Sequence, residues 1–177
     1  MEVYPVSEDT LLMLDNIRCG KKVLEVGTGN GAIAIECAKS GSSVLAVDID
    51  KEAVKRLREE AKIKNLKIET KVSDLFENVD GKYDTIIFNP PYLPGNPKDL
   101  KDLQWAGGGK YGDEVILKFL DVAWKYLADD GEIYIILSSF NRLNKIFEMP
   151  YKFEKIAQKK FSFHEIYLYR AKKIKER

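Results

Sequence analysis

The sequence is poor in the residues that build metal and redox sites. It has two cysteines and one histidine among 177 residues. Cys19 and Cys37 have neither a metal-ligand spacing nor a redox-motif spacing, so we expect no metal site and a cytosolic protein. Cys37 lies within an apolar helical pattern, which predicts packing inside a helix rather than chemistry.

Long apolar runs and an excess of one charge are missing as well. No apolar stretch approaches the roughly 18 residues of a membrane span. The start, Met1-Glu2, lacks the basic and then apolar segment of a signal peptide. The 29 Lys and Arg residues nearly balance the 28 Asp and Glu residues, so no global field attracts nucleic acid or a membrane. Without repeats, linkers or low-complexity segments, residues 1–177 are expected to form one domain.

Apolar runs alternate with helical patterns along the chain. This alternation is typical of a mostly parallel sheet with helices on both faces. A long irregular stretch over 90–113 is expected to be functional, because such loops rarely serve as mere connectors. The patterns predict helices over 7–18, 32–39, 51–64, 114–127 and 141–147, strands over 22–26, 43–47, 67–72, 85–88 and 133–137, and a terminal antiparallel hairpin over 153–159 and 166–170. They also predict Ser7 as a helix N-cap, Ile63 on the apolar face of its helix, and a turn at Asp130-Gly131 before the strand over 133–137.

A glycine-rich segment follows the first predicted strand and opens the next helix. It reads Glu25-Val26-Gly27-Thr28-Gly29-Asn30-Gly31, and its glycines allow a tight turn and a close approach to a ligand. The second strand ends at Asp48, whose carboxylate could bind a ribose diol. These features alone fit both NAD and S-adenosylmethionine. The Gly-x-Gly-x-Gly spacing after an acidic residue favours S-adenosylmethionine.

Asp74 and Leu75 follow the third predicted strand, at the edge where open α/β sheets bind ligands. Asp74 could accept a hydrogen bond from an adenine amino group, and Leu75 could supply an apolar face. The alternative for Asp74 is an ordinary loop or N-cap residue.

The tetrapeptide Asn89-Pro90-Pro91-Tyr92 follows an apolar strand. The two prolines lack backbone N–H groups, so the Asn89 side-chain oxygen cannot fold onto the next residues. A proline also keeps the residue before it extended. The Asn89 side chain and the Pro90 carbonyl are therefore free to accept both hydrogens of an amide or an exocyclic amine. The structural alternative is a strand followed by a proline-capped loop.

Together these motifs resemble the class I methyltransferases of the HemK/PrmC release-factor glutamine group. The Asn-Pro-Pro-Tyr motif is shared with methyltransferases that modify amines of DNA and RNA, so it indicates chemistry rather than substrate. Three further features resemble the short archaeal and eukaryotic branch. They are the N-terminal stretch from Tyr4 to Leu12, the Trp105-Ala106-Gly107-Gly108-Gly109 stretch with Gly112, and the lack of the bacterial N-terminal helical domain.

The resemblance implies a Rossmann-like, seven-stranded sheet and S-adenosylmethionine as the cofactor. It implies methylation of the glutamine in a Gly-Gly-Gln tripeptide of a translation release factor. It also implies a small zinc-binding activator subunit, paired beside the strand over 67–72. Residue by residue, the family pattern places the cofactor at Thr10, Glu25, Gly27, Gly29, Asp48, Asp74, Leu75 and Asn89. It places the target amide at Asn89, Pro90, Pro91, Tyr92 and Trp105, with Asn89, Pro90 and Tyr92 as catalytic residues.

Several alternatives stay open. Trp105 and the glycines through Gly112 are expected to form a mobile clasp, the competing view being a loop that packs Trp105 onto the core. His164 is expected at the surface, in the turn before the last strand. The target could instead be an RNA or DNA amine or a protein lysine, or the chain could be an inactive cofactor-binding subunit. A local basic patch for nucleic acid could come from Lys155, Lys159, Lys160, Arg170, Lys172 and Lys173.

Overall fold

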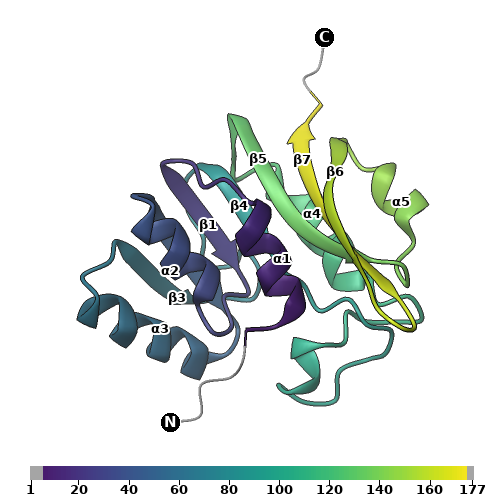
Figure 1. The fold of residues 1–177 in the computed structure, drawn as a ribbon, viewed down its shortest axis with the longest axis horizontal. Helices are drawn as coiled ribbons and strands as arrows, with labels where there is room; N and C mark the ends of the chain where they lie inside the picture. The colour runs from purple at the N-terminus through teal and green to yellow at the C-terminus, as the bar shows by residue number, and fades with distance from the viewer. Residues whose placement is uncertain (1–5, 175–177) are drawn as a thin grey trace.

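Five parallel strands and a C-terminal antiparallel hairpin form one mixed sheet (Figure 1). The structure is a computed structural model and describes residues 6–174, so Tyr4 and Pro5 of the N-terminal motif lie outside it. The strand order is β3-β2-β1-β4-β5-β7-β6, with β7 antiparallel to both of its neighbours. The predicted fold class is confirmed. The strands are β1 (Lys22–Val26), β2 (Ser43–Asp48), β3 (Ile68–Val72), β4 (Tyr83–Phe88), β5 (Leu127–Ser138), β6 (Tyr151–Lys160) and β7 (Glu165–Lys173).

Helices cover both faces of the sheet, as predicted. In Figure 1, α1, α2 and α3 lie in front of the sheet, and α4 lies behind it. A short 3-10 helix, η1, interrupts the long loop after β4 and was not predicted. The helices are α1 (Glu8–Asn16), α2 (Ala32–Lys39), α3 (Lys51–Ile63), η1 (Asp102–Gln104), α4 (Glu114–Ala123) and α5 (Leu143–Phe147).

The central strands are buried on both faces, because parallel strands alternate their side chains between two helical layers. In β4, Ile86 packs in the same cluster as Phe119 of α4, whereas Ile87 packs with Met13 of α1. All four side chains are fully buried. Burying one such side chain stabilises the fold by about 1.5–3 kcal/mol relative to leaving it exposed. The two hydrophobic layers therefore fix the relative positions of the strand ends and of the residues that follow them.

The predicted boundary between α4 and β5 was wrong. The helix ends at Ala123, and Leu127 already pairs with Tyr83 of β4. The register shifts between this pair and the next, which places Asp130 and Gly131 inside β5 rather than in a turn before it. A Cβ atom on Gly131 would lie 2.8 Å from the Leu127 side chain, so glycine fits this irregular stretch.

Smaller differences occur in three helices. Ser7 occupies the N-cap position of α1 as predicted, but its side chain makes no cap hydrogen bond. Ile63, predicted to belong to the apolar face of α3, is 84% exposed at the end of that helix. Helix α5 begins at Leu143 rather than at Asn141.

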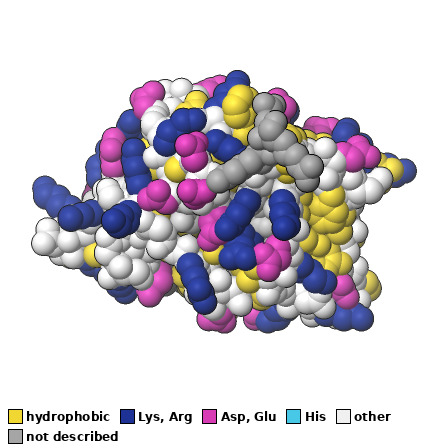
Figure 2. Space-filling view, turned by 90° about the horizontal axis from the view of Figure 1, so that it is seen from above, with side chains coloured by type: hydrophobic (Ala, Val, Ile, Leu, Met, Phe, Trp, Pro, Cys, Tyr) yellow, Lys and Arg dark blue, Asp and Glu magenta, His cyan; other side chains and the backbone are white. Residues whose placement is uncertain are grey.

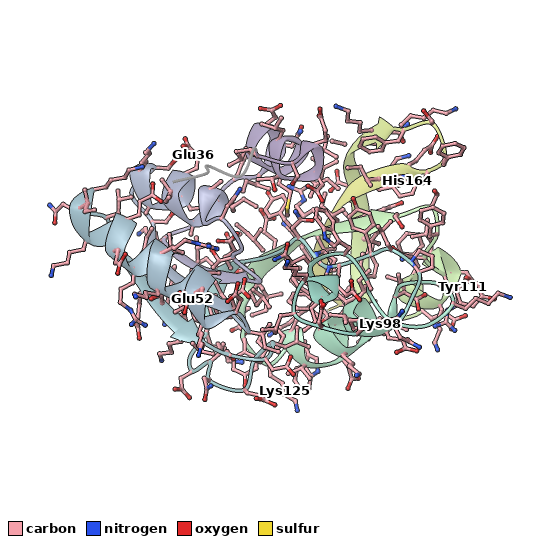
Figure 3. The ribbon with its side chains drawn as sticks, turned by 90° about the horizontal axis from the view of Figure 1, so that it is seen from below. Glu36, Glu52, Lys98, Tyr111, Lys125 and His164 are labelled. Carbon is pink, nitrogen blue, oxygen red and sulfur yellow. A yellow bond between two sulfur atoms is a disulfide. The ribbon has the colours of Figure 1, made fainter. Side chains whose placement is uncertain are left out.

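Cys37 is fully buried in the hydrophobic core, as its helical packing predicted, but the sequence interpretation missed its cross-link. Cys37 of α2 forms a disulfide with Cys19, which lies between α1 and β1 (Figure 3). The two Cα atoms are 5.6 Å apart and the residues are 18 positions apart in sequence. The disulfide joins the segment that enters β1 to the helix that leaves the glycine-rich loop. No helix in residues 6–174 is long and apolar enough to span a membrane.

Candidate active site

The segments predicted to bind ligands all begin at one edge of the sheet. Val26 at the end of β1 lies opposite Val47 of β2 and Phe88 of β4. Asp48 at the end of β2 lies opposite Val72, the last residue of β3. The chain runs from β1 outward to β3 and then returns to β4 on the other side of β1. Such a switch in strand order opens a ligand crevice at the carboxyl ends of the strands.

The backbone of the glycine-rich loop is held by the end of β2. The amide groups of Gly27 and Thr28 donate to the Val47 carbonyl at 2.8 and 3.0 Å. The amide of Gly29 donates to the Asp48 carboxylate at 2.9 Å. Gly27 and Gly29 have φ values of +70° and +53°, a region that glycine adopts without strain. The local sequence therefore places this loop beside Asp48.

The glycines of this loop serve two different purposes. A Cβ atom on Gly31 would lie 2.7 Å from the Leu57 side chain, so Gly31 lets α2 pack against α3. A Cβ atom on Gly29 would meet nothing within 4 Å. Gly29 thus borders open space on the side where a ligand would lie.

Glu25 is buried, with only 3% of its surface exposed. Its Oε2 atom accepts hydrogen bonds from the Thr28 hydroxyl at 2.7 Å and from the Ala34 amide at 3.1 Å. Burial raises the pKa of Glu25 to about 8, although both hydrogen bonds act in the opposite direction. The carboxyl group therefore ties the loop to α2, and its predicted contact with a cofactor stays a prediction.

Asp48 is half-buried at the end of β2. Its two carboxylate oxygens accept from the Asp50 and Gly29 amides, both at 2.9 Å. Burial raises the pKa of Asp48, and these hydrogen bonds oppose the rise. The position after the strand and beside the loop suits the predicted ribose contact.

The turn after β3 holds Leu75 in a strained conformation. Its φ is +48°, which is rare for a bulky side chain and costs on the order of 1–3 kcal/mol. The Ser73 hydroxyl donates to the Leu75 carbonyl at 3.0 Å and accepts from the Asn78 amide at 3.0 Å. Asp74 is exposed beside Leu75. Strain of this kind often collects at ligand sites, and the predicted adenine contact stays a prediction.

The Asn89 side chain carries an unpaired acceptor. Its Nδ2 atom lies 3.5 Å from the Thr10 hydroxyl. Its Oδ1 atom is buried and has no hydrogen-bond partner, and no other side-chain polar atom of residues 6–174 is in that situation. Leaving a buried acceptor unpaired costs about 1–3 kcal/mol. Such a cost, beside a buried Pro90, indicates an atom kept for a donor that arrives with a ligand.

Tyr92 is half-buried next to the N-terminal helix. Its hydroxyl donates to the Asp9 carboxylate at 3.4 Å. Burial, and then the nearby Asp9 carboxylate, raise the pKa of Tyr92 well above its ordinary value. The sequence interpretation missed Asp9, although it is adjacent to Thr10 in the N-terminal motif. That adjacency was the available signal.

His164 lies in the turn before β7, as predicted, and is half-buried among aromatic rings. Its ring lies 5.2 Å from the Phe140 ring and 4.9 Å from the Phe161 ring, both in stacked geometry. The Tyr92 ring lies 6.3 Å away. The hairpin between β6 and β7 thus reaches the Asn89–Tyr92 segment.

Residues 93–112, here called the substrate-side loop, pack directly on the Asn89–Tyr92 segment. The Leu93 amide donates to the Trp105 carbonyl at 2.9 Å, and the Gly107 amide donates to the Leu93 carbonyl at 3.0 Å. A Cβ atom on Gly112 would lie 2.4 Å from the Tyr92 carbonyl oxygen. The glycines therefore permit close backbone packing, and the expected mobile clasp stays a prediction.

Trp105 itself points outward. Its side chain is 59% exposed, which excludes the alternative of a loop that packs Trp105 onto the core. The structure brings Thr10, Asn89 and Tyr92 together and places Trp105 on the substrate-side loop. Contact of Trp105 with a target remains a prediction.

Comparisons with a protein-family model and with curated proteins both match this chain to methyltransferases. Residues 6–166 match the family described as methyltransferase small domain. A Methanocaldococcus jannaschii protein that carries the name of an N5-glutamine methyltransferase is 42% identical over 93% of this chain and 89% of its own length. A Streptococcus pneumoniae release factor glutamine methyltransferase is 36% identical over 71% of this chain, a match that spans 48% of that protein.

A solved structure shares the fold. The E. cuniculi Mtq2-Trm112 complex, described as methylating the eRF1 translation termination factor, superposes with a TM-score of 0.74. The match covers 98% of this chain and 100% of that chain at 24% identity. At this identity the likeness supports the Rossmann-like methyltransferase fold and no finer point.

Proposed function

Because the chain belongs to the methyltransferase small domain family and is of the HemK/PrmC type, we propose that it methylates a glutamine side-chain amide in a translation release factor. The target would be the glutamine of a Gly-Gly-Gln tripeptide. The observation that carries the proposal is the buried, unpaired Oδ1 atom of Asn89, which precedes the Pro90 carbonyl. Two acceptors on consecutive residues would suit a flat amide, whose nitrogen presents two hydrogens.

The strand ends fit S-adenosylmethionine. Gly29 borders open space, Asp48 suits a ribose diol, and the strained Leu75 would face the adenine. When bound, S-adenosylmethionine supplies an electrophilic methyl group on its sulfonium. The residues proposed to hold it are Thr10, Glu25, Gly27, Gly29, Asp48, Asp74, Leu75 and Asn89.

The chain's own residues would position and polarise the acceptor nitrogen. An amide nitrogen is a poor nucleophile, because its lone pair is delocalised into the carbonyl group. Asn89 Oδ1 and the Pro90 carbonyl would accept both N–H hydrogens and aim the nitrogen at the methyl group. They would also stabilise the positive charge that develops on nitrogen as the N–C bond forms and the S–C bond breaks. Tyr92 would pack on the flat amide, and the proton would leave the cationic nitrogen for water.

We also propose a small zinc-binding activator subunit beside β3. This strand is the edge of the sheet next to β2, and Val72 is 45% exposed there. An exposed edge strand can pair with a strand of another chain. In this proposal the described fold is one methyltransferase domain, and the partner supports recognition of the target.

Nucleic acid fits the surface less well. Phosphate contacts normally require clustered, unpaired Lys and Arg side chains. On the face shown in Figure 2, basic and acidic side chains are interspersed. Every member of the predicted basic patch has a partner within the chain: Lys155 with Gln158, Lys159 with Glu8, Lys160 with Glu165, Arg170 with Glu132 and Glu154, Lys172 with Glu132, and Lys173 with the Leu127 carbonyl.

Methyl transfer from labelled S-adenosylmethionine tests the proposal. The acceptors are a release factor containing Gly-Gly-Gln, the same factor with that glutamine replaced, and structured RNA or duplex DNA. Each is assayed with and without the activator subunit. We expect label only on the intact release factor. Label on the factor that lacks the glutamine, or on nucleic acid alone, would overturn the proposed target.

A further inference from the structure

Asn141 connects three segments around the candidate site. It follows β5, is 6% exposed, and uses both ends of its side chain. Its Oδ1 atom accepts from the Ser138 amide at 2.8 Å. Its Nδ2 atom donates to the Tyr92 carbonyl at 3.1 Å and to the Tyr111 carbonyl at 2.8 Å. One buried amide thus joins the end of β5, the Asn89–Tyr92 segment and the end of the substrate-side loop.

The next residue anchors the same loop from the other side. Arg142 donates to the Asp113 carboxylate from Nε at 3.0 Å, from Nη2 at 2.7 Å and from its backbone amide at 2.9 Å. Asp113 is 1% exposed, and burial alone would raise its pKa, but the hydrogen bonds from Arg142 lower it. The guanidinium also lies 4.8 Å from the centre of the Tyr111 ring. This ion pair fixes where the substrate-side loop enters α4, two residues after Tyr111, so it holds the same end of the loop that Asn141 contacts.

We propose that Asn141 is a positioning residue for methyl transfer, acting through the Tyr92 and Tyr111 carbonyls; this rests on the function proposed above. Pro91 has a fixed φ and separates Tyr92 from Pro90 by one residue. The Tyr92 carbonyl is two peptide units from the Pro90 carbonyl, so loss of its hydrogen bond to Asn141 would let the Pro90 carbonyl, one of the two proposed acceptors, shift. A shift of an acceptor by about 1 Å can cost about 10²-fold in rate.

Asn141→Asp removes both donors and keeps an acceptor for the Ser138 amide. We expect kcat to fall by about 10- to 100-fold. The KM for the release factor and the affinity for S-adenosylmethionine, measured by calorimetry without acceptor, should stay within about threefold. Asn141→Ala is the second variant, in case the buried carboxylate prevents folding. Asn144→Ala, an exposed asparagine of α5, is the matched control and should behave as wild type.

A readout independent of catalysis separates this proposal from the proposed function. The chain has two tryptophans, Trp105 on the substrate-side loop and Trp124 after α4. In protein labelled with 5-fluorotryptophan, ¹⁹F NMR of the Asn141 variants should shift or broaden the Trp105 resonance and leave Trp124 unchanged. Wild-type protein without activity on the release factor would refute the proposed function. The Trp105 resonance would still show whether Asn141 holds the substrate-side loop in place.

Two outcomes would overturn the positioning role. The first is a folded Asn141 variant with wild-type kcat. If the wild-type protein is inactive on every acceptor, the corresponding outcome is a Trp105 resonance that does not move in the variant. The second is a loss of cofactor affinity in parallel with kcat while both resonances change, because that pattern marks general destabilisation.

Discussion

The two halves of the candidate site are built in different ways. In the cofactor half, defined by residues 25–31, 48 and 73–75, partners lie close in sequence or on neighbouring strands. Glu25 binds Thr28 three positions away, and Asp48 binds Gly29 nineteen positions away. In the substrate half, defined by residues 89–113 and 141–142, Asn141 binds Tyr92 across 49 positions. Figure 3 shows the labelled Glu52, at the start of α3, well apart from Tyr111 and His164.

The sequence separation between partners differs because, in the proposed function, the two halves would hold different molecules. A glycine turn and carboxylates at strand ends would hold the proposed cofactor, and the local sequence sets both features. In the proposed function, the substrate half keeps two acceptors aimed at one nitrogen. That arrangement leaves Asn89 Oδ1 unpaired, so its position depends on the surrounding packing rather than on its own hydrogen bonds.

The largest effect is expected for Asn89→Ala in the substrate half. Removing one of the two acceptors should lower kcat by about 10²–10³-fold. Binding of S-adenosylmethionine should remain measurable, because the other proposed contacts persist. Single-turnover transfer and calorimetry on the same preparation check both points. Wild-type turnover in this variant would refute the amide pocket.

Gly112→Ala should give the next largest effect. Its φ is +64°, and the new Cβ atom would lie 2.4 Å from the Tyr92 carbonyl oxygen. Displacement of that carbonyl by about 1 Å should lower the transfer rate on the order of 10²-fold. Gly41→Ala, with a φ of +99° and open space around it, is the control and should lose only about 1–2 kcal/mol of stability. Equal losses of rate in both variants would contradict tight packing in the substrate half.

Breaking the disulfide should weaken the cofactor half. Cys19 and Cys37 are 18 positions apart, and closing a loop of that length stabilises a fold by about 3 kcal/mol. Dithiothreitol should therefore lower the melting temperature by several degrees. The Cys19→Ser/Cys37→Ala double variant should melt early and not respond to the reductant. A reductant-insensitive wild-type protein would mean that the cross-link does not contribute.

The smallest predicted effect is a pH dependence that comes from Glu25. Its pKa is about 8 in the folded state against an ordinary 4.5, so the folded protein binds this proton more tightly than the unfolded chain. The free energy of unfolding should therefore fall as pH rises from 4.5 toward 8, by about 2 kcal/mol between pH 6 and 8. Glu25→Gln keeps an acceptor for Thr28 and Ala34 and should remove this slope. Urea denaturation of the wild type and of Glu25→Gln at pH 6 and 8 measures this change in unfolding free energy. An equal change in both proteins would refute the attribution to Glu25.

The sequence interpretation succeeded where the pattern is local. Strand β1 and helix α2 have the predicted bounds, because an apolar run, a glycine loop and a helical period follow one another directly. It failed at the α4–β5 boundary, where the pairing of Leu127 with Tyr83 overrides the helical period. It also missed the Cys19–Cys37 disulfide, since the spacing of two cysteines in sequence does not reveal whether they lie close together in the fold.

The substrate half shows the same limit. Asn89 and its prolines are visible in the sequence, because their chemistry depends on adjacent residues. The contacts of Asn141 with Tyr92 and Tyr111 are not, since an asparagine before a helical pattern normally predicts a cap.

By itself, the sequence determined the α/β order of elements, the glycine loop after the first strand, and the Asn89-Pro90-Pro91-Tyr92 tetrapeptide after the fourth. Each of these depends on residues that are adjacent or follow a single period. Only the tertiary structure decided that Asn89 Oδ1 stays unpaired, that Asp9 meets Tyr92, and that Asn141 donates to the Tyr111 carbonyl. Hydrogen bonds between distant segments form only after the hydrophobic layers have placed the strand ends side by side, and no local pattern encodes that distance.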